Sequence, residues 1–272
     1  MTVLLIIGIA LVLMPILYLL ALRCRNNHPL LRKLRKWNYA HRGLHNDKVP
    51  ENSMTAFRLA LEKGYGIELD LHLLADGNLA VMHDSSLLRT AGVDVPIESL
   101  NTQQLSEYRL LDTQEEIPTF EQVLQLFQGK APMIIELKSA NGNHDALTQT
   151  ACRMLENYDG LYCIESFDPR CIRWLKKNRP DIVRGQLASN SLKEKDLKIP
   201  LILRFWMTNL LTNFWNVPDF IAYCFSDRNQ LSVLLSHKVW KVQNVAWTIK
   251  TREDYDAAVE EGWIPIFEGF EP

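Results

Sequence analysis

The sequence predicts a protein of the α/β class, a (β/α)8 TIM barrel, and two observations lead to that fold. Eight short β-type runs recur along residues 37–272, and several of the stretches between them carry helix start and stop signals. Eight alternations of strand and helix within one domain are typical of a closed parallel barrel. The predicted strands are Tyr39 to Arg42, Ile67 to Leu71, Met133 to Leu137, Tyr162 to Ser166, Val183 to Leu187, Phe220 to Cys224, Lys241 to Trp247 and Ile264 to Phe267.

Helix signals between these strands support the alternation. Thr119 can cap a helix because Gln122 follows three residues later, which is the spacing of a capping box. Asp168 followed by Pro169 is a capping residue before a first-turn proline, and Thr251 can cap the last helix. We therefore expect helices to begin at these three points.

An apolar segment precedes the barrel. Residues 2–22 carry no charged side chain and are mostly apolar, which is close to the roughly 20 residues that a helix needs to cross a bilayer. We therefore predict a transmembrane helix over residues 1–22. The alternative is a signal peptide, which is disfavoured because no basic residue comes before the run.

Basic side chains follow that segment in residues 23–36, the predicted juxtamembrane linker. The positive-inside tendency then predicts a single-pass protein of the cell membrane with its barrel on the cytoplasmic side. Contact between these side chains and anionic lipid headgroups would agree with that orientation. The basic residues are Arg23, Arg25, Arg32, Lys33, Arg35 and Lys36.

The composition is that of an ordinary globular protein, with 47% hydrophobic residues and a formal net charge of −2. This argues against disorder and against an extended basic surface, so we expect no nucleic-acid partner. The five cysteines are scattered without the spacing of a metal site, so we expect free thiols.

Two segments of the sequence are not explained by a simple alternation of strands and helices. Residues 85–116 occupy a connection that usually takes about two to six residues, and their apolar side chains predict an ordered cap over the barrel mouth. Pro200 to Trp215 form an apolar helical stripe that Trp206 widens. We favour a barrel helix with a broad buried face, and an element that contacts lipid remains the alternative.

Acidic side chains converge on one face of the predicted barrel. Glu68 and Asp70 are two residues apart on one strand, and Glu136 lies on the next barrel strand, so their side chains should meet at the carboxyl-terminal mouth. Three ionised carboxylates would repel by about 4 kcal/mol per pair at ~4 Å and an effective dielectric of ~20. An all-oxygen set suits Mg²⁺ or Ca²⁺, and the alternative is an ion-pair cluster with Arg42 and Lys138.

The order and spacing of five motifs resemble the glycerophosphodiester phosphodiesterase family, whose members cleave glycerol-phosphate diesters with a divalent metal. The resemblance runs from about Tyr39 to Thr248. The motifs are His41-Arg42-Gly43, Pro50-Glu51-Asn52-Ser53, Glu68-Leu69-Asp70, His83-Asp84 and Ile135-Glu136-Leu137-Lys138.

The resemblance also implies roles for single residues. Glu68, Asp70 and Glu136 match the metal-binding positions of the family. Trp247 matches a tryptophan that can pack against the glycerol moiety, although a core position is an equal alternative. Glu51 and Asn52 belong to the motif at the start of the first helix, where they can support the site or cap the helix.

One stretch departs from the family pattern. The family usually has a Thr-Asp pair after the last strand, and this chain has Ile266 to Phe270 there. Any substrate contact at this end of the barrel is therefore left open.

A phosphodiester needs charge neutralisation, a base and an acid, and the sequence contains candidates for each. Arg42 and Lys138 can bind phosphate oxygens. His41 and His83 can form the acid and base pair because histidine titrates near neutral pH. His45 lacks comparable neighbours and is expected to be a surface or supporting group.

We therefore expect metal-dependent hydrolysis of glycerophosphodiesters to sn-glycerol 3-phosphate and an alcohol, with membrane lipids as further partners. A lysophospholipase D acting on lysophospholipids is the enzymatic alternative, and it would need an acyl-chain groove beside the metal. A catalytically silent, membrane-tethered binding barrel is the alternative from another class. The complete acid, base and metal set argues against that last possibility.

Overall fold

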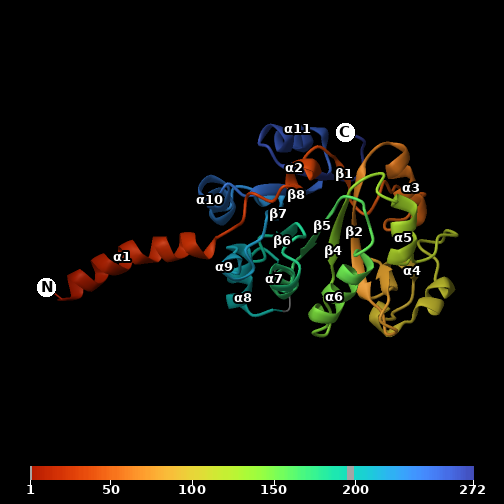
Figure 1. The fold of residues 1–272 in the computed structure, drawn as a ribbon, viewed down its shortest axis with the longest axis horizontal. Coiled ribbons are helices and arrows are strands. Elements are labelled where there is room, and N and C mark those ends of the chain that lie inside the picture. The colour runs from red at the N-terminus through yellow and green to blue at the C-terminus, as the bar shows by residue number, and fades with distance from the viewer. Residues whose placement is uncertain (1, 195–198) are drawn as a thin grey trace.

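The computed structural model describes residues 2–194 and 199–272, and in these residues eight parallel strands close into a barrel (Figure 1). Neighbours run in the order β1, β9, β8, β7, β6, β5, β4, β2, and β1 pairs with β2 to close the ring. This confirms the predicted (β/α)8 fold. The strands are β1 (Tyr39–Ala40), β2 (Gly66–Leu73), β4 (Met133–Leu137), β5 (Tyr162–Ser166), β6 (Arg184–Ala188), β7 (Phe220–Cys224), β8 (Gln243–Ile249) and β9 (Ile264–Phe267).

Helices surround the strands, and three of these helices begin at the capping residues that the sequence predicted. The side chains of Thr119, Asp168 and Thr251 each accept a backbone hydrogen bond at the start of a helix. The helices of the outer layer are α3 (Met54–Glu62), α5 (Phe120–Phe127), α6 (His144–Met154), α7 (Pro169–Asn178), α8 (Leu201–Thr208), α9 (Asn213–Asn216), α10 (Leu231–Trp240) and α11 (Arg252–Glu260).

The alternation of side chains along β2 decides what lies inside and outside the barrel. Ile67, Leu69 and Leu71 are fully buried in the cluster that also contains Phe57 of α3 and Phe120 of α5. The intervening acidic side chains therefore point to the barrel interior. Packing of one face against helices is what fixes the register of the polar face.

A short antiparallel strand and three short helices lie between β2 and α5 (Figure 1). The strand β3 (Leu79–Val81) pairs with β2, and the sequence did not predict it. The helices are α4 (Leu88–Ala91), η1 (Ile97–Ser99) and η2 (Thr102–Glu107). They enclose a separate hydrophobic cluster of Leu74, Ala80, Met82, Leu87, Ile97, Leu100, Leu105, Leu110 and Ile117.

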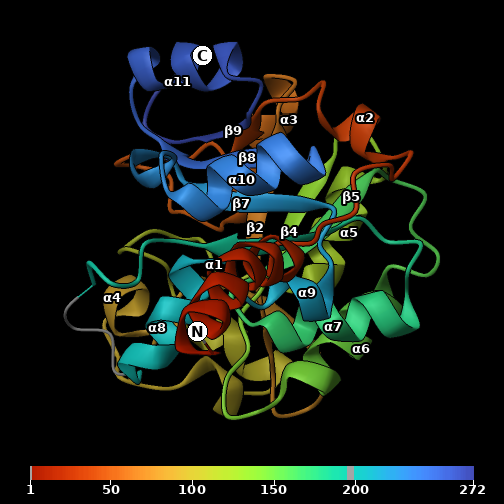
Figure 2. The same cartoon turned by 90° about the vertical axis from the view of Figure 1, so that its left-hand side faces the viewer.

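At the amino terminus, α1 (Thr2–Ala21) projects from the side of the barrel (Figures 1 and 2). Its last turns contact α9 and α10, where the indole Nε1 of Trp240 donates to the carbonyl of Leu19 at 2.9 Å. In the described part of the chain, no helix combines the length and the apolarity needed to cross a membrane. The helix forms as expected, but the structure does not support the predicted transmembrane span.

The basic linker that follows is held against the barrel. The Nη2 atom of Arg25 donates to Asp219 Oδ2 at 2.7 Å, and its backbone N–H donates to the carbonyl of Pro218 at 2.8 Å. Within the linker, α2 (Leu31–Leu34) buries both of its leucines. These contacts fix where the chain enters β1.

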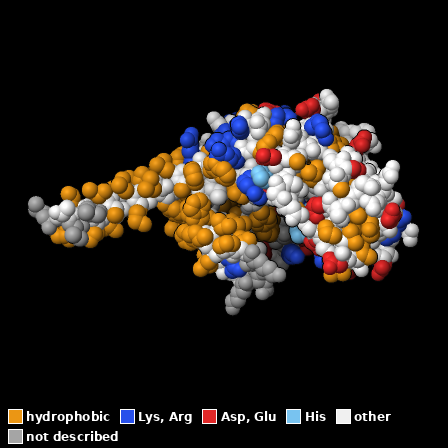
Figure 3. Space-filling model, turned by 90° about the horizontal axis from the view of Figure 1, so that it is seen from below, with side chains coloured by type: hydrophobic (Ala, Val, Ile, Leu, Met, Phe, Trp, Pro, Cys, Tyr) orange, Lys and Arg blue, Asp and Glu red, His pale blue; other side chains and the backbone are white. Residues whose placement is uncertain are grey.

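The apolar stripe of residues 200–215 does not form the buried helix that we favoured. Of the residues of α8, only Thr208 is buried. Leu201, Ile202 and Phe205 are 70%, 60% and 46% exposed. The stripe forms two short helices, α8 and α9, instead of one, and most apolar side chains of α8 are exposed or half-buried (Figure 3). All five cysteines are free thiols, as expected.

Candidate active site

Three carboxylates meet inside the barrel mouth. Glu68, Asp70 and Glu136 are buried, and each offers an oxygen within 4.8 Å of the others. Strand register causes this meeting, because Asp70 of β2 lies directly beside Glu136 of β4. The cluster therefore has the ligand type and spacing of a site for a hard divalent cation.

Two cations lie against these carboxylates. The Nζ atom of Lys138 is 2.7 Å from Glu136 Oε1 and 3.0 Å from Asp70 Oδ1. Arg42 contacts Glu51 Oε1 through Nη1 at 2.8 Å, and its Nε lies 3.5 Å from Asp70 Oδ2. The alternative of an ion-pair cluster is thus partly realised.

Burial and neighbouring charges shift the pKa values of the three acids in different directions. Burial, with Asp70 and Glu136 nearby, raises the pKa of Glu68 well above its usual value. Burial likewise raises the pKa of Glu136 to about 7, although Lys138 opposes this shift. Burial also acts on Asp70, but Lys138, with further cationic neighbours, lowers its pKa below the usual range. A metal ion that binds to these carboxylates would therefore displace protons from the two acids whose pKa is raised.

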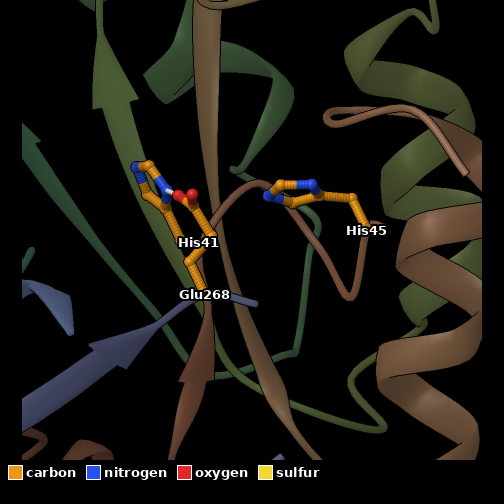
Figure 4. A group of neighbouring side chains, drawn as sticks. All are labelled: His41, His45 and Glu268. Atoms are coloured by element: carbon orange, nitrogen blue, oxygen red, sulfur yellow. Dashed lines mark hydrogen bonds and ion pairs between the residues drawn. The ribbon is translucent and has the colours of Figure 1, made fainter. Parts of the chain in front are cut away.

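Glu268 forms a hydrogen bond with the His41 ring (Figure 4). His41 follows β1, and its Nδ1 atom lies 2.5 Å from Glu268 Oε2. The hydrogen bond from His41 lowers the pKa of Glu268, so this carboxylate is ionised and can only accept. The proton therefore sits on Nδ1, and the Nε2 lone pair is left for chemistry, 3.9 Å from Glu68.

His83 follows β3, and a carboxylate also binds the Nδ1 atom of its ring. Its Nδ1 atom lies 2.5 Å from Asp84 Oδ1, and hydrogen bonds from Arg89 and His83 lower the pKa of Asp84 to about 2 despite partial burial. Burial lowers the pKa of both His41 and His83. Both rings are thus neutral near pH 7, with Nδ1 as the donor and Nε2 free.

Arg89 of α4 connects the inserted segment to the site. Its Nε atom donates to Asp84 Oδ2 at 2.6 Å, and its Nη2 atom donates to Glu51 Oε1 at 2.7 Å. Glu51 in turn binds Arg42. The inserted segment is thereby tied through one side chain to Asp84, the neighbour of His83, and through Glu51 to Arg42.

Asn52 contacts the site, and a neighbour caps the helix. The Nδ2 atom of Asn52 donates to Asp70 Oδ2 at 2.8 Å. Ser53 is the residue whose side chain accepts from the backbone of α3. Neither Glu51 nor Asn52 is therefore the cap, and both side chains are directed to the charged groups of the site.

Trp247 lines the barrel mouth together with Phe167. The two rings meet edge to face with centroids 5.7 Å apart. Both side chains line the same hollow as His41, Glu136 and Lys138. Trp247 thus lies beside the site and packs against Phe167, and its contact with a glycerol moiety stays a prediction.

Three residues at the site were missed by the sequence analysis. Glu165 ends the interior face of β5, beside Glu136, and burial raises its pKa well above the usual value. Its position in the predicted strand was an available signal. Arg89 and Glu268 carried no such signal, because Glu51 and His41, which they contact at the site, are distant from them in the sequence.

His72 and His45 differ in what surrounds them. His72 is buried, with Nδ1 2.7 Å from Glu98 Oε1 and Nε2 3.2 Å from the carbonyl of His83, so it supports the loop that carries His83. His45 lies near His41 and Glu268, and the three offer atoms within 4.8 Å of one another (Figure 4). Glu268 is already bound to His41, which leaves the carboxylate cluster as the better metal candidate.

The model of the glycerophosphoryl diester phosphodiesterase family matches residues 41–267. A glycerophosphodiester phosphodiesterase of Caldanaerobacter subterraneus subsp. tengcongensis is 28% identical over 237 residues, which cover 82% of this chain and 89% of that protein.

Solved structures agree on the fold. An Oleispira antarctica phosphodiesterase in complex with the product sn-glycerol-3-phosphate aligns with a TM-score of 0.68 at 22% identity, covering 85% of this chain and 92% of that one. A glycerophosphodiester phosphodiesterase from Thermotoga maritima aligns with a TM-score of 0.64 at 21% identity, with the same coverage. The chain belongs to the glycerophosphoryl diester phosphodiesterase family and is a phosphoric diester hydrolase.

Proposed function

We propose that this protein hydrolyses glycerophosphodiesters to sn-glycerol 3-phosphate and an alcohol in a reaction that depends on a divalent metal. The observation that carries the proposal is the meeting of Glu68, Asp70 and Glu136 beside Lys138. The family supports the reaction type, and the Oleispira antarctica relative holds sn-glycerol-3-phosphate as its product.

Glu68, Asp70 and Glu136 would hold the metal, either Mg²⁺ or Ca²⁺, since all their donor atoms are hard oxygens. When bound, the ion supplies Lewis-acid polarisation of a phosphoryl oxygen. Arg42 and Lys138 bind the remaining phosphate oxygens, Arg42 through its fork and Lys138 as a point charge.

His41 and His83 move the protons. Each presents a neutral Nε2 while its Nδ1 is anchored to an ionised carboxylate. One ring accepts the proton of the attacking hydroxyl, and the other, which first takes up a proton from solvent on Nε2, donates it to the departing alcohol oxygen. Trp247 packs against the glycerol moiety, and Glu51 and Asn52 orient Arg42 and Asp70.

The test is a substrate panel with metal-stripped and metal-restored protein. Glycerophosphocholine and glycerophosphoethanolamine should be cleaved only after Mg²⁺ or Ca²⁺ is returned. Equal turnover before and after chelation would contradict the metal assignment. Release of phosphate without glycerol 3-phosphate would contradict the reaction.

We also propose that the barrel works at the cytoplasmic face of the cell membrane. The six basic residues of the linker support this, because they suit the anionic headgroups of that face. Cell fractionation with protease digestion of right-side-out and inverted vesicles tests it. Digestion of the barrel in right-side-out vesicles would contradict the proposal.

A further inference from the structure

A second group of metal-binding side chains lies at the carboxyl ends of β1 and β9. His41, His45 and Glu268 offer ligand atoms that all lie within 4.8 Å of one another (Figure 4). This group contains two imidazole rings and one carboxylate, whereas the cluster inside the barrel mouth consists of carboxylates alone. The two groups therefore suit different metal ions, because imidazole and carboxylate ligands select different cations.

Barrel closure and one turn bring the three side chains together. β1 pairs with β9 in parallel, and His41 and Glu268 directly follow the paired residues of these strands. The chain then turns at Gly43, which has a φ of 81° and lies so close to α3 that a Cβ would stand 2.9 Å from Ala56. This turn keeps His45 at the same end of the barrel, and Figure 4 shows the Glu268 carboxylate between the two imidazole rings.

The His45 ring has a nitrogen that is available to a ligand. Its Nε2 atom is buried, and it has no hydrogen-bond partner among residues 2–194 and 199–272. A buried polar atom without a partner costs free energy, and a bound metal ion would remove that cost. Burial also lowers the pKa of His45, which keeps the ring neutral near pH 7 as a metal ligand requires.

Glu268 is the anionic member of the group. Its Oε2 atom lies 2.5 Å from His41 Nδ1, and its Oε1 atom lies 2.9 Å from Lys250 Nζ. A metal ion between Glu268 and His41 would take the place of the proton on Nδ1. Two metal bonds of about 2.1 Å at a tetrahedral angle put their ligand atoms about 3.3 Å apart, so the two side chains would separate by less than about 1 Å.

We propose that His41 Nδ1, His45 Nε2 and Glu268 bind Zn²⁺ or a similar borderline-soft cation, and that this cation inhibits the enzyme. The inference rests on the proposed function, because the inhibition is measured on that reaction. Two imidazole nitrogens and one carboxylate form a ligand set that zinc sites use, with a fourth position for water. The all-oxygen cluster inside the mouth keeps its preference for Mg²⁺ or Ca²⁺.

Coordination through Nδ1 removes the lone pair that His41 needs for the reaction. Without a metal at Nδ1, the ring proton sits on that atom and Nε2 is free. A neutral imidazole has one ring proton, so binding of the ion to the Nδ1 lone pair moves that proton through solvent to Nε2. Nε2 then cannot accept a proton from the attacking hydroxyl. The inhibiting ion thus acts on His41 without entering the carboxylate cluster.

The test titrates ZnCl₂ into the full chain while glycerophosphocholine turnover is measured at saturating Mg²⁺ or Ca²⁺. In the unaltered protein, saturating Zn²⁺ should lower kcat by about 10² with little change in KM, as loss of a general acid or base does. Further Mg²⁺ or Ca²⁺ should not restore the rate. Recovery of the rate on adding either ion would place the zinc in the carboxylate cluster and overturn the inference.

His45→Ala separates the zinc site from the reaction, because His45 has no part in the proposed mechanism. Its rate without zinc should equal that of the unaltered protein, which also shows that it is folded. The Zn²⁺ concentration for half-inhibition should rise by about 100-fold or more, since even the loss of a supporting residue costs about 10-fold to 100-fold in metal affinity.

His237→Ala is the matched control, because this histidine lies on α10 and its ring contacts the carbonyl of Val242. Its response to zinc should match that of the unaltered protein. Equal inhibition of His45→Ala and the unaltered protein would overturn the inference and leave the proposed function standing.

Calorimetry with ZnCl₂ gives a result that does not depend on turnover. In the presence of Mg²⁺ or Ca²⁺, the unaltered protein and His237→Ala should bind a zinc ion that His45→Ala does not bind. If no glycerophosphodiester is cleaved, this pattern still supports the site, although the proposed function has failed. Zinc binding that His45→Ala keeps unchanged would overturn the site, and binding without inhibition of an active enzyme would overturn the inhibitory role.

Discussion

The Oε2 atom of Glu268 and the Nδ1 atom of His41 lie 2.5 Å apart, and they join the last strand of the barrel to the first. The backbone reinforces this joint, because the N–H of His41 donates to the carbonyl of Phe267 at 2.9 Å. Closure of the barrel is thus what places the carboxylate behind the histidine. The chain departs here from the usual Thr-Asp pair of its family and still supplies an acid.

Loss of Glu268 should impair the chemical step. Glu268→Ala removes the group that fixes the Nδ1–H tautomer of His41, so kcat should fall by about 10-fold to 100-fold with little change in KM. The acidic limb of the kcat profile should also move, because His41 loses its anionic neighbour. Steady-state kinetics between pH 5 and 9 would measure both effects.

Glu271→Ala is the control for that variant, because Glu271 pairs with Lys63 at the surface near the same chain end. It should keep kcat and the pH profile. If Glu268→Ala changed only thermal stability, or if both variants lost equal activity, Glu268 would be a structural residue of the carboxyl terminus.

Each histidine that we propose as an acid or base should be needed for rate more than for binding. His41→Ala and His83→Ala should each lower kcat by about 10² or more with modest change in KM, as loss of a general acid or base does. His45→Ala supplies the comparison, since His45 is close to His41 but makes no contact with the carboxylate cluster. A rise in KM at unchanged kcat would make the altered histidine a binding group.

The metal should stabilise the fold through the three carboxylates. Adding Mg²⁺ or Ca²⁺ to the chelated protein should raise its Tm, and Glu68→Gln should abolish that rise. The metal-free Tm of Glu68→Gln should match that of the unaltered protein, because burial raises the pKa of Glu68 and already favours its neutral form.

Glu253→Gln provides the surface comparison, because this residue lies exposed in the first turn of α11. Its metal-induced rise in Tm should equal that of the unaltered protein. A normal rise in Glu68→Gln, measured by scanning fluorimetry with each metal, would remove Glu68 from the ligand set.

Arg89 should couple the inserted segment to the reaction. Arg89→Ala breaks its contacts to Asp84 and Glu51, so kcat/KM should fall by up to about tenfold, a limited effect because the exposed ion pair is screened by water. Arg109→Ala, which removes an ion pair with Glu116 in the same segment, should have no effect on kcat/KM. Equal kinetics in the two variants would show that the segment acts without this contact.

The strands were predictable because side-chain alternation and turn residues are local. β4, β5 and β7 have the predicted bounds, and β2 places Glu68 and Asp70 inward as its pattern indicated. The short β3 was missed because three residues give too little pattern to recognise. Local signals also found the caps at Thr119, Asp168 and Thr251.

What escaped the sequence depends on long-range placement. The contact between Glu268 and His41 spans 227 residues, and only ring closure creates it. The stripe at residues 200–215 was also mispredicted for a long-range reason. Its periodicity reveals an apolar face but does not say what covers that face. Leu201 and Ile202 on α8 are 70% and 60% exposed, whereas Leu210 of the same stripe is buried.

The pH dependence of stability should report the proton held by Glu136. Its pKa in the metal-free fold is raised by burial from 4.5 to about 7, so the native state binds more protons than the unfolded chain between these values. The free energy of unfolding then falls as pH rises from about 4.5 to 7. Glu136→Gln carries no titrating group there, so subtracting its stability curve from that of the unaltered protein isolates this contribution.

Metal binding should show the opposite trend, because the ion competes with that proton. The Kd for Mg²⁺ or Ca²⁺ should decrease as pH rises toward 7, and calorimetry in buffers of different ionisation enthalpy should detect proton release on binding. Above about pH 7 the release should decrease, since Glu136 is then already ionised and no longer contributes a proton. Proton release that persists unchanged to pH 9, or metal affinity that strengthens in acid, would contradict a shared site for the proton and the metal.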